Sequence, residues 1–127
     1  MKMLPHIYIA STEHKGRGVF TALEILADSV IEICPLILIP TEETKLIDQT
    51  TLYNYYFVWD DDHLAIALGY GSLYNHSSTP NARVIYDFET NEIQIEAIRD
   101  ILDGEEILIH YLDDENEMTN LWFKEKN

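Results

Sequence analysis

Residues 67–77 read ALGYGSLYNHS, and this stretch is the most informative part of the sequence. It begins as an apolar strand pattern and passes through two glycines into small polar side chains. Small polar side chains ahead of Pro80 normally form a loop that bonds its own backbone, which makes His76 a structural loop histidine. Asn75 and His76 also present a side-chain amide, a ring and two backbone groups side by side. Such a set can bind the edge of a purine, so both interpretations stand at this point.

Short strands separated by turns make up the pattern on both sides of this stretch. Strand-like residues are expected at 6–10, 19–20, 30–39, 53–59, 64–68, 83–88, 93–98 and 107–111. The strongest hairpin signal is the turn at 89–92. One short helix is expected from Thr41, which can cap it, to about residue 48 or 49, with Leu46 and Ile47 facing inward. No repeat or linker interrupts the chain, so the sequence predicts one mainly β domain with short helices.

The charge of the chain excludes several classes of function. Its 127 residues include 23 acidic and 8 basic side chains, which gives a formal charge of −15. A domain that binds nucleic acid through phosphates, or a membrane through a polybasic face, needs far more Lys and Arg. Disorder is also excluded, because 46% of the residues are hydrophobic. We therefore expect no direct nucleic-acid partner and no membrane partner, and the natural macromolecular partner is a basic one.

Cys34 is the single cysteine, so no internal disulfide and no paired-cysteine zinc site can form. It sits in an apolar run, and a buried thiol without a chemical role is the preferred interpretation. The N-terminal residues lack the apolar stretch of a signal peptide, and no segment approaches the roughly 20 apolar residues of a membrane span. An intracellular, soluble protein is expected.

Two further motifs could carry chemistry. Residues 16–18 read GRG between two predicted strands, where paired glycines allow a tight turn or a close approach of the backbone to a small anionic or zwitterionic group. Residues 103–111 read DGEEILIHY, a polar turn that leads into a strand ending at Tyr111. Each motif alone indicates no more than a β-rich domain.

The order and spacing of the three motifs give a stronger signal. GxG near the N-terminus, NHSxxPN at 75–81 and GEEI-x-I-x-Y ending at Tyr111 resemble the SET-domain protein lysine methyltransferases. Residues 67–77 are similar to those of free-standing SET proteins from bacteria and large viruses. The resemblance implies a β-clip fold of several small curved sheets, in which the NHS segment and the last strand meet in a knot-like crossing. It implies a single domain over 1–127, with a core at 7–111 and a tail at 112–127 that forms part of a lid over cofactor or substrate.

The same resemblance implies an enzyme that transfers a methyl group from S-adenosylmethionine to a lysine amine of a basic protein, such as a histone or a ribosomal protein. The reaction is an in-line displacement that leaves S-adenosylhomocysteine and requires no metal. The protein has to align the reacting atoms and present the amine neutral, although a free lysine has a pKa of about 10.4. A narrow aromatic channel favours the neutral amine because it excludes water.

Site residues follow from matching the family's motifs to this chain. Tyr111 is expected to be the catalytic residue and to face the cofactor as well. The amino-acid end of the cofactor is expected at residues 15–18, and its adenine and ribose side at residues 75–76. The expected cofactor-binding residues are Lys15, Gly16, Arg17, Gly18, Asn75, His76, Tyr111 and Trp122. For the adenine, Phe123 is an alternative to Trp122, and both could instead pack as hydrophobic residues. The expected walls of the lysine channel are Tyr55, Tyr56 and Tyr70.

Two alternatives to an active enzyme remain. One is a catalytically inactive SET-fold module that binds peptides or acts as a scaffold, and the other is a β-clip domain that binds a carbohydrate or small molecule. All three motifs, including Tyr111, are intact, which favours the enzyme. The chain lacks the cysteine-rich zinc modules that flank many nuclear relatives, so the tail or a second subunit of a homodimer has to complete the lid. Such an enzyme would act in the cytoplasm, or in a host nucleus if its source were a virus or an intracellular parasite.

Overall fold

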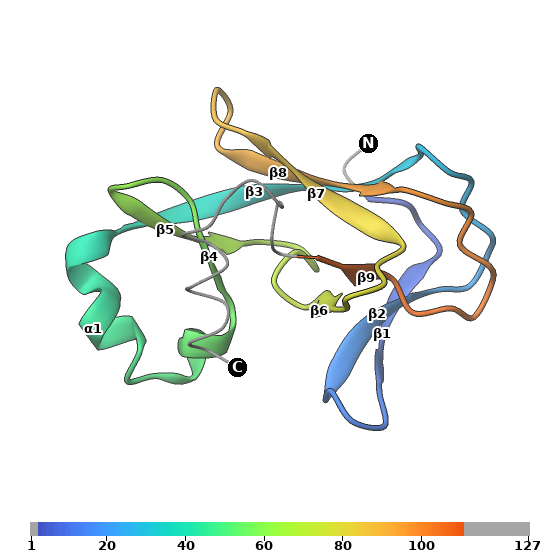
Figure 1. Cartoon of the computed structure of the whole chain (residues 1–127), viewed down its shortest axis with the longest axis horizontal. Coiled ribbons are helices and arrows are strands. Elements are labelled where there is room, and N and C mark those ends of the chain that lie inside the picture. Colours follow the sequence, from blue (N-terminus) through green and yellow to red (C-terminus); the bar gives the residue numbers. More distant parts are fainter. Residues whose placement is uncertain (1–2, 111–127) are drawn as a thin grey trace.

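Three separate sheets make up the computed structural model, which describes residues 3–110 (Figure 1). The strands are β1 (Ile7–Ser11), β2 (Arg17–Thr21), β3 (Val30–Pro40), β4 (Tyr56–Val58), β5 (His63–Ala67), β6 (Asn75–His76), β7 (Ala82–Asp87), β8 (Glu92–Ala97) and β9 (Leu108–Ile109). The helical elements are the 3-10 helix η1 (Thr41–Glu43), the helix α1 (Thr44–Ile47) and the 3-10 helix η2 (Thr51–Asn54). The prediction of a mainly β fold of several small sheets is confirmed.

The largest sheet has the strand order β4-β5-β3-β8-β7, and all its pairs are antiparallel. Residues 30–35 of β3 pair with β8, whereas residues 36–40 pair with β5. Pro35 lies at this change of partner, so its missing N–H falls at the end of the β3–β8 ladder and not inside it. The predicted hairpin at 89–92 joins β7 to β8, and Asn91 adopts the positive φ of 56° that such a tight turn requires.

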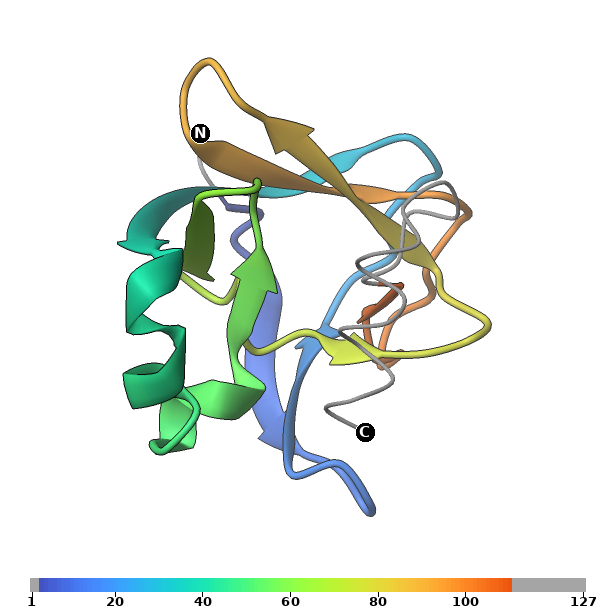
Figure 2. The same cartoon turned by 60° about the vertical axis from the view of Figure 1, so that its left-hand side comes forward.

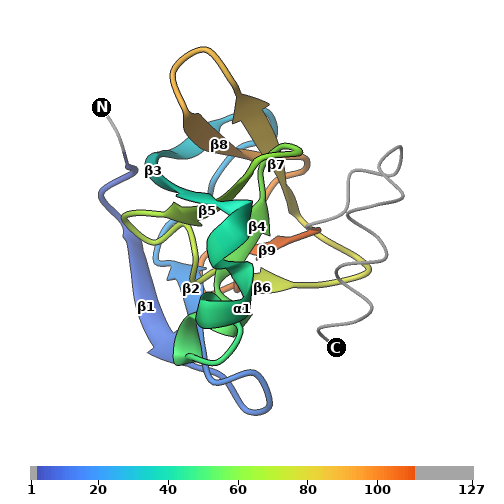
Figure 3. The same cartoon turned by 90° about the vertical axis from the view of Figure 1, so that its left-hand side faces the viewer.

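Two smaller sheets complete the fold and bring distant segments together. The β1–β2 hairpin extends away from the large sheet (Figure 1; Figure 2). The two-residue strands β6 and β9 pair in parallel, with Asn75 opposite Leu108 and His76 opposite Ile109. They lie side by side in the views of Figure 1 and Figure 3. The middle motif and the GEE motif, about thirty residues apart along the chain, therefore share one small sheet.

Isoleucine side chains dominate the apolar core between the sheets. Eight isoleucines of the described residues are less than 7% exposed, namely Ile7, Ile25, Ile31, Ile93, Ile95, Ile101, Ile107 and Ile109. β-branched side chains of this kind suit the half-buried face of a pleated strand. Cys34 belongs to the same core with no exposed surface, and its burial raises the pKa of the thiol far above the usual range. The described structure thus bears out the prediction of a buried, inert thiol.

The helix is shorter than predicted, and Leu46 does not face the core as expected. The predicted first turn is the separate 3-10 helix η1. Thr41 is the first residue of η1 and therefore does not cap it. The α-helix α1 that follows spans only four residues. Leu46 is 66% exposed, so the expectation that it faces inward was wrong. A helix this short gains little from propagation after its costly first turn, and it presents no continuous apolar face to the core. The first part of the predicted strand at 53–59 is likewise helical, because η2 precedes β4.

Within residues 3–110, no helix is long and apolar enough to cross a membrane.

Candidate active site

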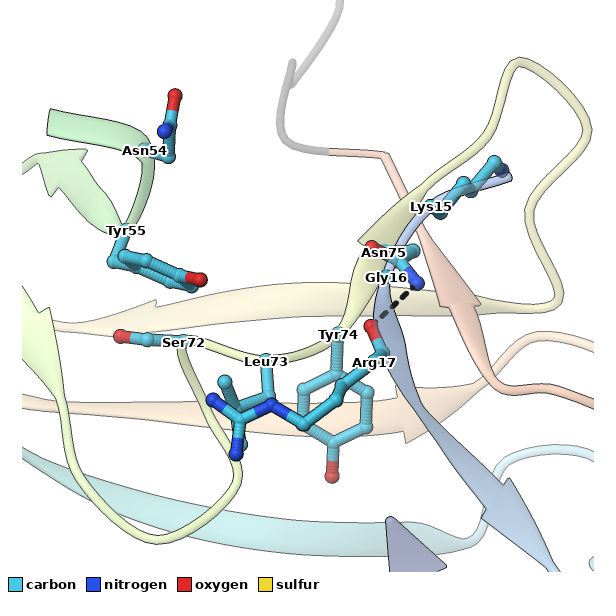
Figure 4. Close-up of a pocket in the computed structure, with 9 residues that line it drawn as sticks. All are labelled: Lys15, Gly16, Arg17, Asn54, Tyr55, Ser72, Leu73, Tyr74 and Asn75. Atoms are coloured by element: carbon cyan, nitrogen blue, oxygen red, sulfur yellow. Dashed lines mark hydrogen bonds between the residues drawn. The ribbon is translucent and has the colours of Figure 1, made fainter. Parts of the chain in front are cut away.

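A cavity of about 290 Å³ opens where the β1–β2 loop faces the segment that leads into β6 (Figure 4). Its lining residues are Lys15, Gly16, Arg17, Asn54, Tyr55, Ser72, Leu73, Tyr74 and Asn75. Four of the residues expected at the cofactor, from the GRG loop and the NHS motif, thus line one cavity. Lys15 and Arg17 give it two cations, and the hydroxyls and amides give it neutral donors and acceptors. This composition suits a ligand that carries a carboxylate or a zwitterionic group.

The side-chain amide of Asn75 joins all three sequence motifs. Its Nδ2 donates to the backbone oxygen of Arg17 at 3.0 Å (dashed in Figure 4) and to Oε2 of Glu106 at 2.8 Å. Arg17 belongs to the GRG motif and Glu106 to the GEE motif. Because the two hydrogens of the amide nitrogen are used in this way, the amide oxygen is the atom that Asn75 can still offer to a ligand.

Gly18 allows this junction to close. A Cβ atom at Gly18 would lie 2.2 Å from Oε2 of Glu106 and 2.9 Å from Nδ2 of Asn75. Both distances are well below van der Waals contact, so any side chain at this position displaces the two groups that meet there. Gly18 is therefore required for the close approach of β2 to the NHS motif. Gly18 itself, although expected at the cofactor, is not among the residues that line the cavity.

Lys15 joins the GRG loop to β6 from the other side. Its Nζ donates to the backbone oxygen of His76 at 3.0 Å, and its backbone N–H donates to Oγ1 of Thr12 at 2.8 Å. The second bond closes the loop that carries the glycines. The ammonium of Lys15 thus lies at the boundary between the cavity and β6.

His76 packs its ring edge-on against the ring of His110, with centroids 4.7 Å apart. Burial, followed by the charges of His110 and Lys15, lowers the pKa of His76 from 6.5 to about 4. The ring is therefore neutral at physiological pH. A neutral ring keeps one nitrogen as a hydrogen-bond acceptor, which a protonated histidine lacks.

This lowered pKa predicts a pH dependence of folding. As the pH falls, the unfolded chain binds a proton at position 76 near pH 6.5, whereas the folded chain binds it only near pH 4. The contribution of His76 to stability is thus fully present above pH 6.5 and declines as the pH falls toward 4. Urea unfolding across this range should show a steeper loss of stability for wild type than for His76→Asn. Parallel losses would contradict a lowered pKa at this residue.

Asn81 and Glu106 belong to the site, although the sequence analysis did not assign either residue to it. Asn81 is 1% exposed; its Nδ2 donates to the backbone oxygen of Glu106, and its Oδ1 accepts from the N–H of Leu108, both at 2.8 Å. It holds β9 beside β6 through these two bonds. Asn81 closes the NHSSTPN run and Glu106 belongs to the GEE run, so the motifs contained them, but their contacts depend on the pairing of distant segments.

The three tyrosines expected in the lysine channel have different positions. Tyr55 lines the cavity. Tyr56 is buried and its hydroxyl donates to Oδ1 of Asp48 at 2.8 Å, and Tyr70 packs against the core. Neither Tyr56 nor Tyr70 lines the described cavity. The structure therefore brings Tyr55 together with the expected cofactor residues and leaves the other two apart from this cavity.

Three residues of the expected site lie outside the described part of the chain: Tyr111, Trp122 and its alternative Phe123. Among residues 3–110, no group of three or more His, Cys, Asp or Glu side chains is placed to hold a metal ion.

Comparison with known proteins gives concordant matches. The family model described as SET domain matches residues 16–112. The chain is 38% identical over 119 residues to the Histone-lysine N-methyltransferase, H3 lysine-37 specific, of Schizosaccharomyces pombe, a match that covers 93% of this chain and 77% of that protein. It also resembles the crystal structure of a Plasmodium falciparum protein described as a candidate histone methyltransferase. That likeness has a TM-score of 0.71 and 37% identity, and it covers 89% of this chain and 98% of the other.

Proposed function

Because the chain belongs to the SET-domain family and is a protein-lysine N-methyltransferase, we propose that it transfers methyl groups from S-adenosylmethionine to a lysine of a basic protein such as a histone. The observation that carries this proposal is the junction at Asn75. One amide there joins the GRG loop, the NHS motif and Glu106 beside a cavity with two cations.

The residues of the cavity fit the proposed cofactor. S-adenosylmethionine has a carboxylate and an ammonium at its amino-acid end, and it supplies an electrophilic methyl carbon bonded to a sulfonium. Lys15 and Arg17 would hold the carboxylate, and the free amide oxygen of Asn75 would accept a hydrogen bond from the ammonium. His76, whose ring is neutral, would lie on the adenine and ribose side together with the backbone of β6.

The protein's part in the reaction is to align the lysine amine and keep it neutral. The amine must lose a proton before its lone pair can attack the methyl carbon, and an apolar, aromatic wall favours that loss because it disfavours the charged form. Tyr55 is the channel tyrosine that the cavity supports. Tyr111 is proposed as the catalytic residue whose hydroxyl faces the reacting centre.

The acidic charge of the chain favours a basic substrate. A formal charge of −15 attracts lysine-rich peptides and repels acidic ones. Part of this charge, the turn Asp60–Asp62 between β4 and β5, is exposed. The Schizosaccharomyces pombe relative is named for a histone lysine, which supports a histone as substrate here and an intracellular reaction. Ribosomal proteins offer the same chemistry.

The domain organisation of residues 1–127 is part of the proposal. Residues 1–127 are proposed to form one domain, with a core at 7–111 and a tail at 112–127 that contributes part of the lid. Trp122 or Phe123 would then cover the adenine, and a second subunit could complete the lid in a homodimer.

Transfer of labelled methyl groups tests the proposal. The protein is incubated with methyl-labelled S-adenosylmethionine and, in separate reactions, with core histones, ribosomal proteins and an acidic control protein. We expect labelling of the basic substrates. The labelling should weaken as salt is added, because salt screens the attraction between the acidic surface and the basic substrate. Cofactor binding without transfer would instead indicate the peptide-binding or scaffold module, and absence of cofactor binding would contradict both functions.

A further inference from the structure

Glu32 is a buried carboxylate that the proposed mechanism does not use. It is 2% exposed, and its neighbour Ile31 has no exposed surface. Successive residues of a regular strand point to opposite faces, so their joint burial needs an explanation. The register supplies it: between Val30 and Glu32 the chain advances two residues on β3 and only one on β8. This β-bulge re-aims the Glu32 side chain, and bulges often do so beside active sites.

The carboxylate of Glu32 reaches across to the wall of the cavity. Its Oε1 accepts from the hydroxyl of Tyr74 at 2.7 Å, and its Oε2 accepts from the backbone N–H of Tyr70 at 2.9 Å. Burial, and then the charge on Glu32, raise the pKa of Tyr74 well above its usual range, so its hydroxyl remains a donor. One carboxylate thus holds both ends of residues 70–74.

Residues 70–74 form part of the cavity. Ser72, Leu73 and Tyr74 line it, and the next residue is Asn75, whose amide joins the three motifs. Figure 4 shows these side chains along one wall, with the Tyr74 hydroxyl directed away from Asn75. No regular strand covers residues 70–74, so the bonds to Glu32 are among the contacts that fix this wall.

Gly69 shows how closely the segment approaches the carboxylate. It has a φ of +67°, and a Cβ atom on it would lie 2.2 Å from Oε2 of Glu32. The chain therefore turns directly against the carboxylate before it forms the cavity wall.

We propose that Glu32 is a positioning residue for the cofactor cavity, which acts by holding residues 70–74 and through them Asn75. The inference rests on the proposed function, because the ligand of the cavity is taken to be the methyl donor. Glu32, which lies outside the three motifs, would thus control the affinity for the cofactor.

Calorimetric binding of S-adenosylhomocysteine to the full chain tests this assignment. Glu32→Ala removes both acceptors, and we expect its Kd to rise about tenfold. Glu32→Gln should stay within about threefold of wild type, because its amide oxygen can accept from Tyr70 while its NH₂ donates to the Tyr74 hydroxyl. Tyr74→Phe, which loses one of the two bonds and keeps the ring, should fall between them.

Ile31→Ala is the matched control, since it truncates the neighbouring core residue on the same strand. It should lower Tm as Glu32→Ala does, yet leave the Kd within about twofold of wild type. Equal loss of affinity in both variants, or a wild-type Kd in Glu32→Ala, would overturn the assignment. If Glu32→Ala does not fold, a wild-type Kd in Tyr74→Phe would overturn it. Wild-type protein that fails to bind would overturn the proposed function first.

Discussion

Tyr111→Phe should lower kcat for methyl transfer by about 10²–10³, the usual cost of removing one hydroxyl or amide donor aimed at a reacting centre. Tyr111 ends the GEEI-x-I-x-Y motif, and the proposed mechanism directs its hydroxyl at the reacting centre. Tyr111 lies outside the described residues, but β9 ends two residues earlier, at Ile109, which pairs with His76. Single-turnover transfer to a histone substrate, measured at saturating S-adenosylmethionine, gives the rate of the chemical step.

Binding measurements separate a catalytic role from a structural one. The Kd of Tyr111→Phe for S-adenosylhomocysteine should stay close to that of wild type, because the ring is retained. Tyr8→Phe is a matched control on β1, where the half-exposed Tyr8 ring stacks on Phe20 away from the cavity residues, and it should keep wild-type kcat. A wild-type kcat in Tyr111→Phe would show that the chemistry does not need this hydroxyl.

Gly18→Ala should weaken binding of S-adenosylhomocysteine by about tenfold or more, the effect of losing one or two well-placed hydrogen bonds. The added methyl group would lie 2.2 Å from Glu106 and 2.9 Å from Asn75, so both side chains must move. Their movement breaks the bond between them and turns the amide that faces the proposed cofactor. Calorimetric titration of the variant against wild type measures the loss.

Gly104→Ala provides the control for this substitution. Gly104 has a φ of +84°, so alanine is strained there, but nothing lies within 4 Å of its added Cβ. The strain costs roughly 1 kcal/mol of stability and leaves the site in place. Equal losses of affinity in the two variants would mean that general destabilisation, and not displacement of Asn75, explains the effect at Gly18.

Local signals allowed the strands and turns to be predicted from sequence. The hairpin at 89–92 and the turn at Gly104 depend on residues close together in the chain, and both are present. The helix at 41–49 was overestimated, because a capping residue and acidic first turn do not supply the tertiary packing that extends a helix. The meeting of the NHS segment with the last strand left no local signal and was expected only from the family resemblance, and the structure shows that β6 and β9 pair there in parallel.

The site could be predicted in part for the same reason. Glycines and polar motif residues identified one end of the cavity, where Lys15 and Asn75 line it. The choice between Tyr55 and Tyr56 could not be made from composition, since Tyr55 precedes β4 and lines the cavity whereas Tyr56 begins β4 and bonds to Asp48. Glu32 gave no signal at all, because its burial depends on a bulge that appears only when β3 pairs with β8.

Mass spectrometric mapping of a deuterated methyl group tests directly whether the protein methylates lysine. Wild-type protein is incubated with S-adenosylmethionine carrying a CD₃ group and with a core histone, and the product is digested and sequenced by fragmentation. We expect CD₃ on the side-chain nitrogen of one or a few lysines, and none when S-adenosylmethionine is omitted. Cofactor binding with no CD₃ on any lysine of the basic substrates would contradict it.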